Sequence, residues 1–230
     1  EREAKVIRRI QELNDGPLTN KNILKLYREI MSVCLSLEEP LRVSYLGPKG
    51  TYTQLATQNH FGKSVLSIPE ASVEEVFASV EKRDSHYGVV PVENSSQGIV
   101  SSTLDMFMKS SLRISGEIEI LINHNILSNS KKLSDIEKIY AHPQSFAQCK
   151  EWLERNMPNS KKISSTSNAE AALIASSENN SAAIASEVAA EIYKLRVLSK
   201  NIEDNHNNST RFLVIGDRDT EPSGNDKTSI

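Results

Sequence analysis

Four short segments carry side chains that could hold an anionic ligand. They read GPKGTYT from Gly47, VPVENSSQG from Val90, HPQSFAQC from His142 and NNSTRF from Asn207. Each flanks a β-prone run, and polar loops at strand ends line the cleft of open α/β sheets. The sequence has no Ser-His-Asp spacing, no paired catalytic carboxylates and no Cys/His cluster. The set can bind carboxylates and hydrogen-bond a hydroxyl, but it offers no strong acid.

The first segment follows a predicted strand and precedes a predicted helix. Gly47 and Gly50 permit a tight turn, and Thr51 or Thr53 can cap the helix. Free N–H groups at a helix N-terminus attract anions. The segment lacks the third glycine of a dinucleotide fingerprint and the Gly-Lys-Ser/Thr end of a phosphate loop. A carboxylate or a hydroxylated ring therefore fits as well as phosphate, and an ordinary turn without a ligand is the alternative.

The second and third segments add amide groups. Asn94 offers both a donor and an acceptor, and Glu93 can orient a neighbour, although a helix cap with a solvated loop explains the same residues. Gln148, near the start of a predicted helix, could reach the same cleft. A lone histidine more often makes one structural hydrogen bond than it performs catalysis, so we interpret His142 as structural.

The fourth segment precedes a short apolar run that ends at Gly216. Thr210 and Arg211 would stand at the mouth of this buried strand, where ligands bind. The alternative is a turn organised by Ser209 and Thr210 with a solvated arginine.

Composition limits the possible functions. The chain has 230 residues, 38% of them hydrophobic, which suits one large or two small globular domains. A net charge of -3 without a basic tract argues against nucleic acid. Cys34 and Cys149 lie far apart, which argues against a disulfide framework or a structural metal site and fits a reducing cytoplasm. There is no apolar run long enough to span a membrane and no signal peptide.

The elements that position these segments follow from periodicity. Residues 1–39 read as a two-helix hairpin broken at Gly16-Pro17, with Thr19 or Asn20 as the second N-cap. Its apolar stripes have little to bury against, so we expect a partner chain, giving a homodimer, or a missing piece. From Leu41, β-prone runs alternate with amphipathic segments, which predicts a mainly parallel sheet flanked by helices. Helices are expected at 53–61, 73–82, 102–108, 146–155, 168–176 and 187–193.

The longest predicted strand, 117–127, could cross from one lobe to another. We therefore expect two lobes with a cleft between them, and we interpret the charged segment 217–229 as a linker or tail.

In this order and spacing, the four segments together resemble the prephenate dehydratase domain over residues 41–219. The resemblance implies a two-lobed, periplasmic-binding-protein-like (type 2) α/β fold. Its lobes would comprise about 41–116 with 200–219, and 117–199. It also implies an ACT regulatory domain that binds phenylalanine, to which 220–230 would be the linker; feedback inhibition would be missing from this chain.

The N-terminal hairpin, 1–39, resembles the last two helices of the chorismate mutase domain that precedes this dehydratase in many bacteria. Arg2, Glu3 and Glu38 match positions of that mutase's active site. Because the family's long first helix does not precede them, mutase activity of this chain is doubtful.

The resemblance implies that prephenate loses water and carbon dioxide to give phenylpyruvate, a step of phenylalanine biosynthesis that needs no cofactor or metal. It implies that Thr210 hydrogen-bonds the leaving hydroxyl, while Asn94 and Gln148 position the ring. Thr51 and the Gly50 backbone would hold the pyruvyl carboxylate, and Arg211 a carboxylate or the loop. The remaining substrate contacts are expected from Glu93, Ser95 and Phe212.

One departure concerns Ala141. Many family members carry a hydroxyl residue directly before His-Pro-Gln. If that hydroxyl assists catalysis, Ser145 or a water would have to replace it here, or turnover would be lower. Two alternatives stay open: arogenate dehydratase, and a non-catalytic two-lobed binding module. The Thr210 hydroxyl at a strand mouth favours an enzyme.

Overall fold

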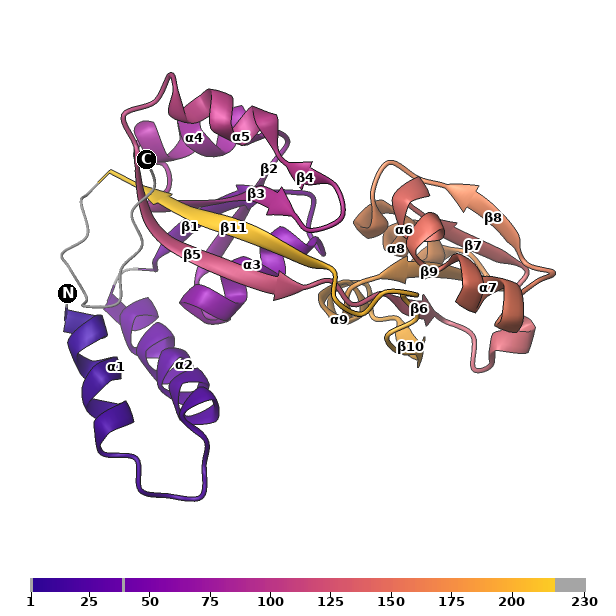
Figure 1. Ribbon diagram of the computed structural model, residues 1–230, viewed down its shortest axis with the longest axis horizontal. Coiled ribbons are helices and arrows are strands. Elements are labelled where there is room, and N and C mark those ends of the chain that lie inside the picture. Colours follow the sequence, from indigo (N-terminus) through magenta and orange to yellow (C-terminus); the bar gives the residue numbers. More distant parts are fainter. Residues whose placement is uncertain (1, 39, 218–230) are drawn as a thin grey trace.

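A helical hairpin stands beside a body of two α/β lobes in the computed structural model, which describes residues 2–38 and 40–217 (Figure 1). The hairpin consists of α1 (Arg2–Glu12) and α2 (Asn20–Glu38). Thr19 caps α2, since its Oγ1 accepts a hydrogen bond from the Asn22 N–H at 3.3 Å. Helix α2 packs against α3 (Tyr52–Phe61) of the first lobe.

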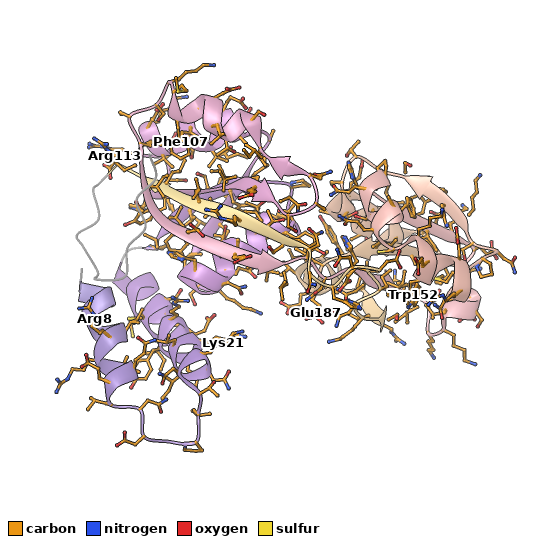
Figure 2. The ribbon with its side chains drawn as sticks, in the orientation of Figure 1. Arg8, Lys21, Phe107, Arg113, Trp152 and Glu187 are labelled. Atoms are coloured by element: carbon orange, nitrogen blue, oxygen red, sulfur yellow. The ribbon has the colours of Figure 1, made fainter. Side chains whose placement is uncertain are left out.

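The first lobe has a sheet in the order β2-β1-β3-β11-β5, with β4 on the edge of β3. The strands are β1 (Arg42–Leu46), β2 (Leu66–Glu70), β3 (Tyr87–Asn94), β4 (Gly98–Ile99), β5 (Arg113–Leu121) and β11 (Ser209–Gly216). Helix α3 covers one face, while α4 (Val73–Glu81) and α5 (Ser101–Phe107) cover the other. Phe107 of α5 is labelled in Figure 2. Its ring packs edge-on against Phe77 of α4, with 5.3 Å between ring centroids.

The second lobe repeats this three-layer plan with the order β10-β6-β9-β7-β8. Its strands are β6 (Asn125–Ser128), β7 (Lys138–Ala141), β8 (Lys161–Ser164), β9 (Ser181–Ala185) and β10 (Arg196–Ser199). One face packs on α6 (Pro143–Gln148) and α7 (Lys150–Asn156), the other on α8 (Asn168–Ser177) and α9 (Glu187–Tyr193). A short 3₁₀ helix, η1 (Leu133–Asp135), precedes β7. Small alanines let α8 lie close to the sheet.

Three predictions about these elements were wrong. The sheets are mixed rather than mainly parallel. In the first sheet β11 returns from the second lobe and runs antiparallel to both β3 and β5, and in the second sheet β6 runs antiparallel to β9 and β10. The predicted strand 117–127 divides, because residues 122–124 form the crossing and bond to the returning segment: Ile122 N–H donates to Asn208 O at 2.8 Å. The predicted helix 146–155 is two helices that meet at Cys149, so Gln148 ends α6 rather than beginning a helix.

The other predicted helices match to within one or two residues at each end. The expected architecture of two α/β lobes with a cleft behind a helical hairpin is confirmed. The predicted linker, 220–230, lies outside the described residues, as do the side chains of Arg2, Glu3 and Glu38. Among the described helices, none has the length and apolarity needed to cross a bilayer.

Candidate active site

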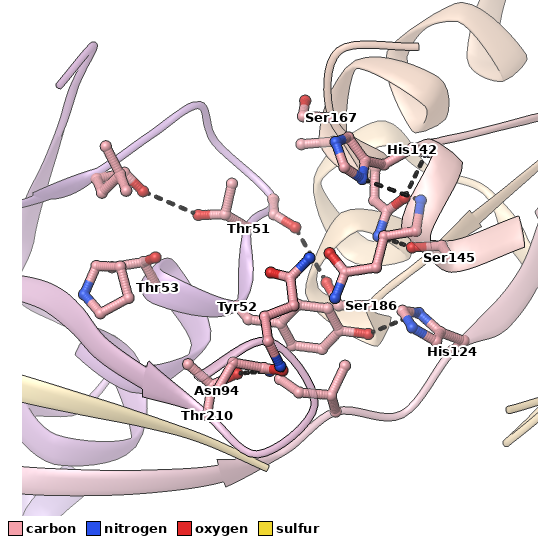
Figure 3. A pocket seen from close by; sticks show the side chains of 18 of the residues that line it. Thr51, Tyr52, Thr53, Asn94, His124, His142, Ser145, Ser167, Ser186 and Thr210 are labelled. Carbon is pink, nitrogen blue, oxygen red and sulfur yellow. Dashed lines mark hydrogen bonds between the residues drawn. The ribbon is translucent and has the colours of Figure 1, made fainter. Parts of the chain in front are cut away.

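A cleft of about 340 Å³ lies between the lobes (Figure 3). The first lobe and the crossing supply Leu46, Gly47, Gly50–Thr53, Pro91, Asn94, Gln97, Val100, Ile122, His124, Asn208, Thr210 and Phe212; the second supplies His142, Gln144, Ser145, Gln148, Thr166–Ala169 and Ser186. None of these residues is Asp, Glu, Lys or Arg. The cleft therefore presents hydroxyl, amide, imidazole and backbone groups without a fixed charge.

Thr210 and Asn94 are paired across neighbouring strands. They face each other in the β11–β3 register, and the Asn94 Nδ2 donates to Thr210 Oγ1 at 2.7 Å (Figure 3). The Asn94 Oδ1 accepts from the backbone N–H groups of Ser96 at 3.0 Å and Gln97 at 3.2 Å. These two donors fix the amide orientation, because only its oxygen can accept. Thr210 must then accept from Asn94, which leaves its own hydrogen for a ligand.

Gln148 and His124 link the lobes on the same side of the cleft. The Gln148 Oε1 lies 2.8 Å from His124 Nε2, and its Nε2 donates to Ser96 Oγ at 3.1 Å. On its other side, the His124 Nδ1 lies 3.3 Å from the Tyr52 hydroxyl, which donates to Asn123 O at 2.6 Å. Burial lowers the pKa of His124 and raises the pKa of Tyr52.

Four helices begin at the cleft, and their N-caps all line it: Thr51, His142, Ser167 and Ser186 (Figure 3). Each side chain accepts a hydrogen bond from a backbone N–H of its own first turn. The positive ends of four helix dipoles therefore face a cleft without cationic side chains, an arrangement that favours an anionic ligand.

The Gly50 backbone is already engaged. Its N–H donates to Gln54 Oε1 at 2.7 Å, and its carbonyl accepts from the Ser186 hydroxyl at 3.0 Å. Gly50 has φ +92°, and a Cβ there would lie 3.2 Å from Tyr193 of α9. Glycine is required because the loop is left-handed and lies against the second lobe. The expected role of this backbone in carboxylate binding does not fit these contacts.

Six of the nine predicted site residues line the cleft: Thr210, Asn94, Gln148, Gly50, Thr51 and Phe212. Glu93, Ser95 and Arg211 are not among the lining residues. Because side chains alternate along a strand, Arg211 faces away from Thr210. Its guanidinium binds Glu93 at 2.6 Å and Glu117 at 3.2 Å, and these bonds raise its pKa. Ser95 instead binds Asn208 and the Ser209 N–H.

Two further outcomes concern the third segment. His142 does make the structural bond expected of it, accepting from the Gln144 N–H at 3.3 Å, and it also lines the cleft. Ala141 is buried, and the nearby hydroxyl that lines the cleft belongs to Ser145, which accepts from Asn168 Nδ2 at 2.7 Å.

Sequence reasoning missed Tyr52, His124, Ser167, Asn168 and Ser186. The Ser-x-x-Glu pattern beginning at Ser167 is a helix-start signal that could have placed that residue at a helix N-terminus. His124 lies in the crossing, where no periodic pattern marks it. No group of three metal-binding side chains occurs among the described residues.

Comparison with known proteins agrees with this architecture. The family model described as prephenate dehydratase matches residues 43–220. The bifunctional chorismate mutase/prephenate dehydratase of Pseudomonas aeruginosa is 50% identical over 231 residues, which cover all of this chain and 63% of that protein. The protein of the same name from Stutzerimonas stutzeri is 51% identical with the same coverage. This chain therefore spans less than two thirds of those relatives.

Among solved structures, the prephenate dehydratase of Arthrobacter aurescens in complex with L-Phe superposes with a TM-score of 0.72 at 29% identity. The match covers 82% of this chain and 63% of that one.

Proposed function

Because the chain belongs to the prephenate dehydratase family, we propose that it converts prephenate to phenylpyruvate, water and carbon dioxide. The observation that carries this proposal is the Thr210 hydroxyl, whose oxygen accepts from Asn94 at 2.7 Å and whose hydrogen is left for a ligand. Thr210 is 8% exposed and lines the cleft, so a bound hydroxyl would meet that hydrogen away from bulk water.

In the proposed reaction the ring C–O bond and the bond from the ring to its carboxylate break together or in sequence. The electron pair of the carbon–carbon bond enters the ring, which becomes aromatic, and carbon dioxide leaves. The departing hydroxide takes a proton that comes from solvent and leaves as water. Thr210 donates a hydrogen bond to the oxygen as negative charge develops on it. A weak donor suffices, because gain of aromaticity drives the step.

The carboxylates of prephenate would be held by neutral donors. The N-termini of α3 and α8, capped by Thr51 and Ser167, point into the cleft from opposite lobes. Leaving the ring carboxylate without a cationic partner also suits its loss, because a strong ion pair would stabilise the substrate more than the transition state.

The same composition favours prephenate over arogenate. Arogenate carries an ammonium group where prephenate has a keto group. None of the lining residues is Asp or Glu, so the ammonium would lose water without gaining a carboxylate. We therefore assign prephenate as the preferred substrate.

The remaining parts of the proposal concern the whole protein. Residues 1–39 would be part of a chorismate mutase region, because the match to bifunctional relatives covers all of this chain, including these residues. Exposed apolar residues on the hairpin, Leu13, Leu26, Ile30 and Val33, support a homodimer formed through it. Free Cys34 and Cys149 favour the cytoplasm. Phenylalanine would act only through an ACT domain.

The test is phenylpyruvate formation from prephenate by the chain in a metal-chelating buffer, with phenylalanine formation from arogenate measured in parallel. We expect turnover of prephenate, with kcat/KM at least about tenfold above that for arogenate, on the scale of one unpaired buried polar group. Prephenate binding without turnover of either substrate would show that the chain is a binding module rather than an enzyme.

A further inference from the structure

A chain of side-chain hydrogen bonds runs from the second lobe to Thr210. Its members are His124 Nε2 to Gln148 Oε1 at 2.8 Å, Gln148 Nε2 to Ser96 Oγ at 3.1 Å, Ser96 Oγ to Asn94 Oδ1 at 2.6 Å and Asn94 Nδ2 to Thr210 Oγ1 at 2.7 Å. Ser96 is the one member of this chain outside the cleft lining. We propose that Ser96 is a positioning residue for the dehydration, an inference that rests on the proposed function.

The direction of each hydrogen bond from Gln148 to Thr210 is fixed by chemistry. The amide oxygen of Asn94 carries no hydrogen, so Ser96 must donate to it. The amide nitrogen of Gln148 has only hydrogens to offer, so Ser96 must accept from it. The single hydroxyl hydrogen of Ser96 goes to Asn94, since its other acceptor, Asn208 Oδ1, lies farther away at 3.4 Å. From Gln148 to Thr210, each residue therefore donates a hydrogen bond to the next one.

These hydrogen bonds affect how strongly Thr210 can donate. With Ser96, the Asn94 Oδ1 accepts three hydrogen bonds, from the Ser96 hydroxyl and from the backbone N–H groups of Ser96 and Gln97. Withdrawal of electrons toward that oxygen makes the amide N–H groups better donors, and a hydroxyl that accepts a stronger bond becomes a better donor itself. Ser96 thus strengthens the bond that Thr210 offers to the leaving hydroxyl without touching the substrate.

This series of hydrogen bonds also connects the two lobes. Ser96 lies in the β3–β4 loop of the first lobe, whereas Gln148 ends α6 of the second. In this structure their contact joins the two lobes. Ser96 therefore couples the position of the second lobe to the group that performs the chemistry.

The experiment compares prephenate dehydration by Ser96→Ala, Ser96→Thr and a control, Ser134→Ala. Ser134 is an exposed hydroxyl residue that is not among the residues lining the cleft, and it donates to Asp135 in its own 3₁₀ helix at 3.2 Å. For Ser96→Ala we expect kcat to fall about three- to tenfold, the scale of one hydrogen bond, with KM within about twofold. Ser96→Thr should restore kcat to within about twofold of wild type, and Ser134→Ala should leave it unchanged.

The same substitution in an Asn94→Ala background separates positioning from other roles. If Ser96 acts through Asn94, its loss there should lower kcat by less than about twofold. Wild-type kcat in Ser96→Ala, or the same loss in both backgrounds, would overturn the inference while the dehydratase function stood. An inactive wild-type chain would instead overturn the proposed function, and this inference with it.

Discussion

One hydroxyl hydrogen sets the requirements for the residues around it. Thr210 accepts from Asn94, Asn94 is held by the 95–97 turn, and the remaining hydrogen of Thr210 faces the cleft. A side chain that keeps a hydroxyl in the same place should keep the chemistry. A substitution that removes the hydroxyl should lower turnover but leave the fold intact.

Thr210→Ala is expected to lower kcat by about 10²-fold or more, the scale of one lost donor to a developing oxyanion. Thr210→Ser should retain most of the turnover. Steady-state kinetics with prephenate and the thermal unfolding midpoint measure the two effects separately. Full turnover by Thr210→Ala would show that the leaving hydroxyl has another donor.

Arg211 is expected to act on stability more than on turnover. Its guanidinium joins Glu93 on β3 to Glu117 on β5, and its side chain is 42% exposed. Arg211→Met should lower the free energy of unfolding by about 0.5–1 kcal/mol, because half-exposed ion pairs are weak. Urea unfolding would measure this, with Arg155→Met on the more exposed Glu151 pair as the control. A tenfold rise in KM with unchanged stability would place Arg211 at the substrate instead.

Sequence reasoning placed Thr210, Asn94 and Gln148 correctly in one cleft, because each flanks a predicted strand or helix end. It left open whether Arg211 secures a carboxylate or the loop, because adjacent residues of a strand face opposite sides of the sheet and the pattern does not say which side holds the ligand. It could not find His124, whose position depends on the chain crossing between lobes.

At the scale of elements, the end of α3 makes a half-buried contact with α2 and β5. His60 lies there, with its ring 3.3 Å from the place a Cβ on Gly116 of β5 would occupy. Burial, with the charge of Arg28 on α2, lowers the pKa of His60 from 6.5 to about 4. The unfolded chain therefore binds a proton between these two pKa values that the folded chain does not.

Stability should accordingly fall as the pH drops from 7 to 5. The His60 contribution to this loss is about 1–2 kcal/mol, since each pKa unit is worth about 1.4 kcal/mol. His60→Gln should lose correspondingly less stability between these two pH values, whatever its stability at pH 7. Urea unfolding at both values tests this. Equal losses in the two proteins would mean that His60 titrates alike folded and unfolded.

Predicting elements from periodicity worked where each element had its own core face. The helices α4, α8 and α9 begin at serine N-caps and bury one apolar face, and these were located almost to the residue. The wrong predictions concern segments whose conformation depends on distant parts of the chain. The direction of β11 and the break at Cys149 both depend on contacts between segments distant in sequence, which a local pattern does not contain.

At the scale of the molecule, the hairpin approaches the first lobe closely at Gly62. Gly62 has φ +87°, and a Cβ on it would lie 2.6 Å from the Ser32 Cβ of α2. The Lys63 N–H also donates to Glu29 of α2, at 3.3 Å. Every residue lining the cleft comes from 46–212, outside the hairpin.

Gly62→Ala should therefore loosen the hairpin without reaching the cleft. The left-handed backbone alone costs about 1 kcal/mol with alanine, and the contact with Ser32 adds to it. We expect faster amide hydrogen exchange in α2, with kcat on prephenate within about twofold of wild type. Gly98→Ala, also at positive φ but with no atom near its Cβ position, is the control for backbone strain. Unchanged exchange in α2 would mean that this approach does not hold the hairpin.

The uncharged lining of the cleft affects how ligand binding depends on ionic strength. Mobile ions weaken attraction between fixed charges, over a Debye length of about 8 Å at physiological ionic strength. Of the described residues that line this cleft, none is Asp, Glu, Lys or Arg. On the proposed function, hydrogen-bond donors in direct contact with the substrate would hold it, over distances shorter than a Debye length. Its binding should therefore weaken less as salt rises than binding to a site built on lysine or arginine would.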